Sequence, residues 1–123
     1  MIRLLIAALI AAIAIPAAQA GEADVVAVKY EQGSDGTYTF HVTVRHDDTG
    51  WDHYADKWEV AGPDGTVYGE RVLLHPHETE QPFTRSQSGI AIPDDVTEVT
   101  VRAHDKVHEW GGKEMTVELK GSL

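Results

Sequence analysis

The chain has 123 residues, no cysteine and a net charge of −10. A surface of that sign repels phosphate backbones and anionic headgroups, so the composition argues against nucleic acids and membrane surfaces as partners. The absence of cysteine excludes disulfides and thiolate metal sites, so a small domain of this kind must be stabilised by packing, by hydrogen bonds or by a bound ion.

The first twenty residues are predicted to be an export signal rather than part of the fold. Arg3 supplies one positive charge, residues 4–14 are an unbroken apolar run, and residues 18–20 form a small-x-small cleavage sequence. We expect cleavage after Ala20 and a mature domain over residues 21–123, periplasmic or secreted, with no stable membrane insertion. The mature chain would hold nine basic and twenty acidic residues, a net charge of −11. No cysteine follows the apolar run, which argues against a bacterial lipoprotein anchor.

Beyond the export segment, apolar and polar residues alternate with a period of two, which is the pattern of half-buried strands. The clearest case is residues 37–45, where four apolar side chains from Tyr38 to Val44 alternate with polar ones. Turn sequences rich in glycine, proline and aspartate separate the runs. Strands are expected at about 24–31, 37–45, 54–60, 66–74 and 83–92, around Val99 and Val101, and from Met115 to Leu119.

Seven short strands with no helical period predict an all-β, antiparallel seven-stranded sandwich of the immunoglobulin or fibronectin-III type. Trp58, in the middle of the third strand, is predicted to be its buried aromatic anchor. The cysteine pair of antibody domains is absent, so the pattern indicates the architecture and not that family. A small barrel is the alternative.

Histidine is frequent, with seven residues in the chain. If the strands alternate up and down, the connections after the second, fourth and sixth strands emerge at one end of the sandwich. The mature N-terminus is expected at the same end, because the first strand must run away from it. Only His41 is predicted elsewhere, on the outward face of the second strand. The six histidines predicted at one end are His46, His53, His75, His77, His104 and His108.

Neutral imidazole is the usual protein ligand for zinc and copper, so this end is predicted to bind Cu(II), Zn(II) or a similar divalent ion. His75 and His77 are the first candidates, because in an extended segment both rings project to one side and Pro76 stiffens the segment. Nearby carboxylates would ligate the ion or orient the imidazoles. The alternative is that each histidine only caps a turn or hydrogen-bonds a carboxylate. The next candidates are His53 and His108, then His46 and His104, and the carboxylates are Asp47, Asp48, Asp52, Glu78, Glu80, Asp105 and Glu109.

Tryptophans in the same loops support a second hypothesis. An interaction module would bind a protein, peptide or sugar through Trp51 and Trp110, assisted by Tyr54, and its histidines would be structural. In a domain this small, we favour instead that the two indole rings cover the end of the core. A metalloenzyme is a third possibility and would need an open coordination position. The chain lacks the common hydrolase, zinc-protease, phosphate-loop and dinucleotide motifs, so no catalytic residue is predicted.

Three segments are informative together: Gly50–Asp56, Leu73–Phe83 and Val107–Gly112. They resemble a family of small exported bacterial immunoglobulin-like β-sandwich proteins of unknown function, which implies export and a sandwich but no activity. The chain is also similar in size and architecture to exported copper-binding sandwiches of the CopC-like kind. That pattern has a histidine at the mature N-terminus, where this chain has Gly21. Superoxide reductase has a similar sandwich with histidine ligands, but its activity needs a cysteine thiolate. The expected partner is therefore a metal ion or a periplasmic protein.

Overall fold

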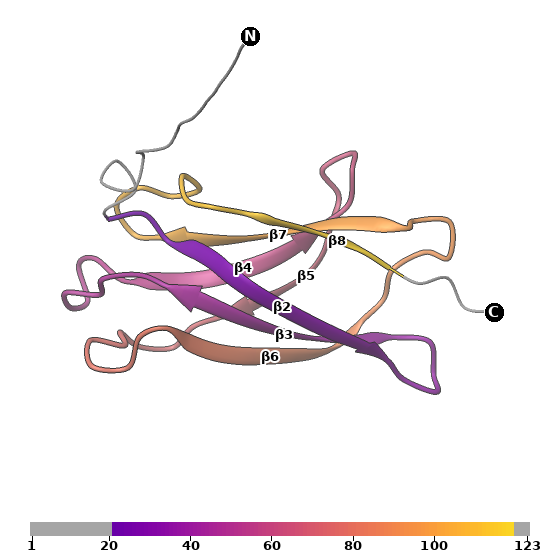
Figure 1. The fold of residues 1–123 in the computed structure, drawn as a ribbon, viewed down its shortest axis with the longest axis horizontal. Helices are drawn as coiled ribbons and strands as arrows, with labels where there is room; N and C mark the ends of the chain where they lie inside the picture. The colour runs from indigo at the N-terminus through magenta and orange to yellow at the C-terminus, as the bar shows by residue number, and fades with distance from the viewer. Residues whose placement is uncertain (1–20, 120–123) are drawn as a thin grey trace, which may run out of the picture.

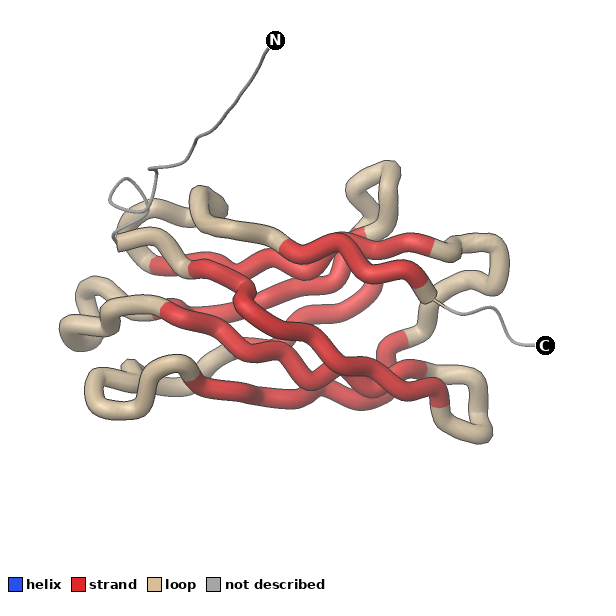
Figure 2. The backbone as a smooth tube through the Cα atoms, in the orientation of Figure 1, coloured by secondary structure: helices blue, strands red, loops and turns tan. Residues whose placement is uncertain are grey.

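The computed structural model describes residues 21–119, so the predicted export segment at residues 1–20 lies outside the described residues. All seven predicted strands are present, and the described chain contains no helix (Figures 1 and 2). In particular, residues 21–119 hold no helix of the length and apolar character that crossing a membrane requires. The strands are β2 (Asp24–Gln32), β3 (Tyr38–Arg45), β4 (Ala55–Ala61), β5 (Val67–Val72), β6 (Phe83–Ile90), β7 (Glu98–Asp105) and β8 (Met115–Glu118).

The strands form two sheets that pack on one another as a β-sandwich (Figure 1). One sheet has three strands in the order β2-β3-β6, and the other has four in the order β5-β4-β7-β8. Every pair of neighbouring strands is antiparallel. The predicted all-β, antiparallel fold is therefore confirmed.

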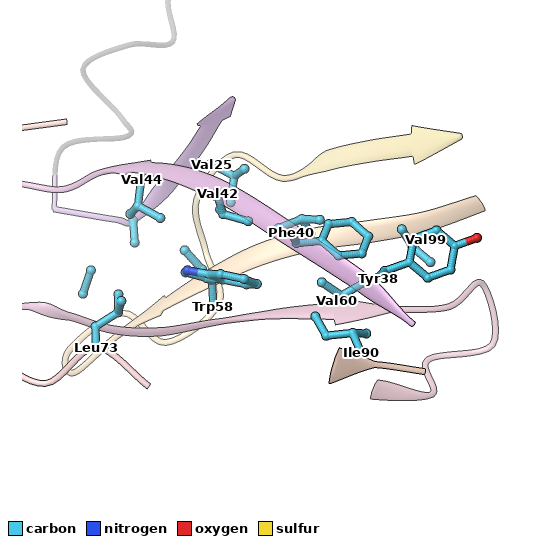
Figure 3. Close-up of a cluster of buried hydrophobic side chains, with 14 of the residues drawn as sticks. Val25, Tyr38, Phe40, Val42, Val44, Trp58, Val60, Leu73, Ile90 and Val99 are labelled. Atoms are coloured by element: carbon cyan, nitrogen blue, oxygen red, sulfur yellow. The ribbon is translucent and has the colours of Figure 1, made fainter. Parts of the chain in front are cut away.

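The alternating pattern of β3 supplies much of the core. Phe40, Val42 and Val44 are each 0 % exposed, whereas the residues between them lie toward the outer face. Trp58 on β4 is also fully buried, as predicted, and Figure 3 shows it facing these side chains from the opposite sheet. Burial of each such side chain stabilises the fold by about 1.5–3 kcal/mol, so this row contributes substantially to the packing of the two sheets.

Glycine is required where the edge strands β5 and β6 of the two sheets meet. A Cβ atom on Gly69 would lie 2.7 Å from Cγ1 and 3.1 Å from Cγ2 of Ile90. Both Ile90 atoms are bonded to a branched Cβ, so they have little freedom to move aside. Gly69 therefore allows the close approach of β5 to the buried Ile90 side chain.

The connections that follow β3, β5 and β7 lie at one end of the sandwich, together with the start of β2 (on the left in Figure 1). Contacts between these loops agree with the view, because Asp48 reaches His77 and His46 reaches Asp105. The expected grouping of histidine-bearing loops at one end is confirmed. His41 lies on β3 and contacts Glu31 and Ser86, away from that end.

We expect Gly69→Ala to destabilise the protein by about 1–3 kcal/mol, because the added methyl group would overpack the contact with Ile90. The free energy of unfolding in urea measures this cost. The same substitution in an Ile90→Ala background should cost much less, because the opposing side chain is gone. Equal costs in the two backgrounds would show that this contact is not the cause. Glu70→Ala, at the exposed neighbouring position, should change stability by no more than about 0.5 kcal/mol.

Candidate metal centre

His46 continues the buried row of β3 past the end of the strand. Tyr38, Phe40, Val42 and Val44 point inward, and the next residue of the same parity is His46, which is 1 % exposed. Asp105 is the last residue of β7 and follows Val99, Val101 and Ala103 on the inward face of that strand, and it is 0 % exposed. The period of two thus carries one imidazole and one carboxylate into the interior from opposite sheets.

Asp48 holds His46 in place. The Asp48 Oδ1 atom accepts hydrogen bonds from His46 Nδ1 at 2.5 Å and from the Ala55 backbone N–H at 3.1 Å. Its Oδ2 atom accepts the backbone N–H of His77 at 2.6 Å. Because Nδ1 of His46 donates to a carboxylate, the neutral ring keeps its lone pair on Nε2. A carboxylate that orients an imidazole in this way is the usual outer partner of a metal-binding histidine.

The side chains of His53 and Asp105 both approach the Nε2 atom of His46. His53 Nε2 lies 3.2 Å from it and Asp105 Oδ2 lies 3.6 Å from it, while His53 Nε2 and Asp105 Oδ1 are 3.5 Å apart. One ligand atom from each of the three residues lies within 4.8 Å of the others. Two ligands bound at about 2.0–2.1 Å to a tetrahedral zinc ion are roughly 3.3–3.4 Å apart. The spacing of this cluster, His46–His53–Asp105, therefore suits a small divalent cation.

The two oxygens of the Asp105 carboxylate differ in their hydrogen bonding to the described residues. Oδ1 accepts the N–H groups of Val107 at 2.8 Å and His108 at 2.5 Å, which fixes the turn after β7. Oδ2 is buried and has no hydrogen-bond partner within residues 21–119. Burying a carboxylate oxygen without a hydrogen-bond partner costs free energy of folding. The Oδ2 atom of Asp105 faces His46 Nε2. A cation bound between these atoms would remove that cost.

The backbone of Gly21 adds a further electron-pair donor. Its carbonyl oxygen lies 3.0 Å from His46 Nε2 and 3.1 Å from His53 Nε2. A proton on His53 Nε2 would satisfy one or two of the contacts around this point, but the Asp105 oxygen and the Gly21 oxygen have no proton of their own to share. A divalent ion would accept electron pairs from all four residues. The arrangement is therefore one that could hold a metal ion.

His108 borders this cluster from its exposed side. Its Nδ1 atom is 3.4 Å from Asp105 Oδ1, and its ring centroid is 5.0 Å from that of His53. The side chain is 36 % exposed, so it covers the cluster without being locked in place. His108 is thus a possible additional ligand, at the entrance from solvent.

The structure does not bring His75 and His77 to the cluster, although the sequence ranks them first. His77 is buried with its ring stacked on Phe83 at 3.9 Å, and its Nε2 atom accepts a hydrogen bond from Arg85 at 3.0 Å. His75 is exposed, and its Nδ1 atom donates to the Pro76 carbonyl. The two rings lie close together, at 4.7 Å, but the lone pair of His77 that a metal would need is already used. His77 instead supports Asp48 through its backbone.

His104 also lies apart, because it has the opposite parity from Asp105 on β7. It projects from the outer face of the sheet, where its Nδ1 atom donates to Asp56 Oδ1 at 2.6 Å. Trp110 packs beside it, with ring centroids 4.9 Å apart, and the Arg102 guanidinium lies 4.2 Å from the indole centroid. The prediction that Trp110 covers the end of the core is therefore wrong, since the ring covers an outer face.

Trp51 does not cover the core either, and that prediction is also wrong. Its side chain is 64 % exposed and makes an edge contact with Tyr54 at 5.6 Å. The loop places this ring on the surface because the inward positions are taken by His46, Asp48 and Ala55. The end of the sandwich is thus closed by a polar cluster and not by indole rings.

Two members of the cluster, His46 and Asp105, follow from a signal that the sequence already contains. Parity along β3 and β7 places both inward and places His104 outward, whereas proximity in the sequence ranks all histidines of a loop alike. No such signal marks Gly21, because every residue has a backbone carbonyl and the residue type does not show which carbonyl reaches a site. Only the path of the chain before β2 shows its role.

Comparison with known proteins finds a related sequence but does not assign the chain to a family. The chain matches no established protein-family model. It is 45% identical over 99 residues to a protein of Halomicrobium mukohataei named "Putative lipoprotein", in an alignment that covers 80% of this chain and 48% of that protein. The chain therefore spans about half the length of this relative.

A solved structure shares the fold. It is that of a hypothetical protein from Pyrococcus horikoshii OT3, with a TM-score of 0.54 at 16% sequence identity. The match covers 80% of this chain and 90% of the other. At this level of identity the similarity concerns the fold alone.

The stability of the metal-free protein should fall as the pH decreases below about 6.5, with His77 as one cause. Burial lowers the pKa of His77, and the charges of Arg85 and His75 lower it further. The unfolded chain therefore takes up a proton before the folded one does, so stability is retained above about pH 6.5 and lost as the pH falls through the folded pKa. Thermal unfolding of the protein with a chelator, at pH values between 7.5 and 5, measures the slope of stability against pH. His77→Gln, which keeps an acceptor for Arg85, should reduce that slope; an unchanged slope would contradict the assignment.

Proposed function

We propose that this protein is an exported metal-binding protein that holds a divalent zinc or copper ion at His46, His53 and Asp105. The observation that carries the proposal is the convergence of two imidazole nitrogens on the buried carboxylate of Asp105, whose Oδ2 atom faces His46 and has no hydrogen-bond partner among the described residues. Asp48 supports it by fixing the tautomer of His46. The export-type sequence of residues 1–20, and a relative named as a lipoprotein, support the location outside the cytoplasm, periplasmic or secreted.

The donor types select the class of ion. Imidazole with carboxylate suits Zn(II) and Cu(II), whereas Cu(I) prefers the thiolate ligands that a chain without cysteine lacks. The cluster lies at the end of the sandwich, with His53 22 % and His108 36 % exposed, so an ion could enter and leave there. Such a site suits metal homeostasis, delivery or protection better than permanent structural binding.

We also propose that the sandwich is of the fibronectin-III type and that the chain belongs with small exported immunoglobulin-like proteins. The strand order supports this, because the first, second and fifth strands form one sheet and the other four form the second. Trp58 is buried at the centre of the third strand, as in many immunoglobulin-like domains. Membership of this group would account for the β-sandwich framework. The identity of the ligand would then depend on the residues of the loops.

Untagged mature protein should bind one equivalent of Zn(II) or Cu(II), and a chelator should lower its melting temperature. A ligand that binds only the folded state stabilises it by about 2.7 kcal/mol at a free concentration 100 times Kd. His53→Ala removes a ligand from a half-buried position and should weaken zinc binding by about 100-fold or more, exceeding the loss typical of outer partners. Competition with a chromophoric chelator measures the affinity.

His75→Ala is the matched control for this experiment. It removes the same side chain from the same end of the sandwich, but at an exposed position outside the cluster. The affinity of His75→Ala for zinc should equal that of the unmodified protein. Loss of binding in His75→Ala with retention in His53→Ala would place the ion at His75 and His77 instead. Protein that binds neither metal would refute the proposal.

A second candidate function is the binding of a protein, peptide or sugar at the same end. Three large apolar side chains are exposed on the three loops there: Trp51 at 64 %, Leu74 at 73 % and Val107 at 56 %. Exposed tryptophan offers a large contact area at small entropic cost. The two functions are compatible, since a metal carrier also needs a surface that its recipient recognises.

The Trp51→Ala variant tests this second function. The variant should keep its stability to within about 0.5 kcal/mol, because the ring is exposed, and should keep its affinity for zinc. In a cross-linking experiment on intact cells, the unmodified protein should yield a partner that Trp51→Ala loses. The same cross-linked products from both proteins would count against a role for Trp51.

A further inference from the structure

The chain just before β2 is fixed beside the His46–His53–Asp105 cluster. Ala23 is 1 % exposed, and the Val25 N–H donates to the Lys113 carbonyl at 2.8 Å. In return the Lys113 N–H donates to Asp24 Oδ1 at 2.7 Å. A Cβ atom on Gly112 would overlap the Ala23 carbonyl oxygen, so the two segments are in direct backbone contact. These contacts determine where Gly21 lies.

In the chain before cleavage, the backbone conformation at position 21 favours glycine. Its φ angle is +93°, a conformation that favours glycine. A Cβ atom there would lie 2.7 Å from Cε1 and 3.2 Å from Nε2 of His108. Together with the contacts of its carbonyl oxygen to His46 and His53, this places the Gly21 backbone among three imidazole rings. Glycine at such a point lets the main chain approach a ligand closely.

We propose that removal of residues 1–20 completes the metal centre, with the new α-amino nitrogen and the carbonyl oxygen of Gly21 both binding the ion. This inference rests on the proposed function. A signal peptidase would hydrolyse the Ala20–Gly21 bond: water supplies the hydroxyl group of the Ala20 carboxyl and a hydrogen for the Gly21 amine. The amine and carbonyl then form a five-membered chelate ring with the ion, beside His46, His53 and Asp105.

The change from amide to amine is what gives the nitrogen its affinity. In a peptide bond the nitrogen lone pair is delocalised into the carbonyl group, so it is a poor metal ligand. A free amine has a localised lone pair. Standard bond lengths place the nitrogen of a residue about 2.7–3.6 Å from its own carbonyl oxygen. The Gly21 oxygen is already 3.0 Å from His46 Nε2, so the amine needs only rotation about bonds of Gly21 to reach the same ion.

A chain with its export segment attached would therefore lack one ligand and bind metal more weakly. Loading with zinc or copper would follow processing rather than precede it. Glycine at position 21 would thus supply two ligands, in place of the imidazole that a histidine would provide at a mature N-terminus.

Three forms of the protein test the inference: the chain from Gly21 to Leu123, the same chain with Ala20 added, and the Gly21 chain with an acetylated amine. All three contain every strand of the fold. The probe is Cu(II) alone, with affinity measured by competition with a chelator and the number of bound nitrogens counted by electron paramagnetic resonance. The form whose free amine is on Gly21 should bind at least about tenfold more tightly, with one more nitrogen ligand than the other two, because the amine of the longer form lies one residue away from the Gly21 carbonyl.

Two other results would overturn the inference in distinguishable ways. Equal affinities and equal nitrogen counts in the three forms would refute the role of the amine and leave the His46–His53–Asp105 site intact. Absence of binding in all three would refute the proposed function as well. Urea unfolding without metal should give the same stability for the three forms, which separates loss of a ligand from loss of the fold.

Discussion

The buried carboxylate of Asp48 is the interaction on which this end of the protein depends. It accepts hydrogen bonds from the His46 ring, the Ala55 backbone and the His77 backbone, so it ties the loop after β3 to the start of β4 and to the loop after β5. A buried charge is costly without such partners, so the loops must adopt the conformation that supplies them. The position and tautomer of His46 follow from this requirement, and the cluster around its Nε2 atom follows from His46.

The sequence predicted the framework well, because strands obey a local rule. Alternation of apolar and polar residues places Phe40, Val42 and Val44 on one face, and the same rule identifies β4 through Trp58. Turn residues separate the strands, and antiparallel order then brings the histidine-bearing loops to one end. Each of these steps uses only neighbouring residues and simple geometry.

The sequence did not predict which histidines converge, because loop conformations depend on partners distant in the chain. His75 and His77 have the spacing of a ligand pair, yet Arg85 and Phe83 hold His77 as a buried, hydrogen-bonded side chain. His53 reaches the cluster only through the turn that brings it back to Gly50. Trp51 is exposed by the same turn, although the small size of the domain favoured a covering role. These outcomes rest on long-range contacts that no spacing rule contains.

The two inward residues of the cluster come from different sheets, since His46 follows β3 and Asp105 is the last residue of β7. An ion held by both would be a cross-link between the two layers of the sandwich, closing a loop of about sixty residues. In antibody domains a disulfide joins the two layers, and this chain has no cysteine with which to form one. Such a cross-link would be reversible and would strengthen or weaken with the supply of metal around the protein. The mechanical stability of the folded domain would then report the metal content of its surroundings.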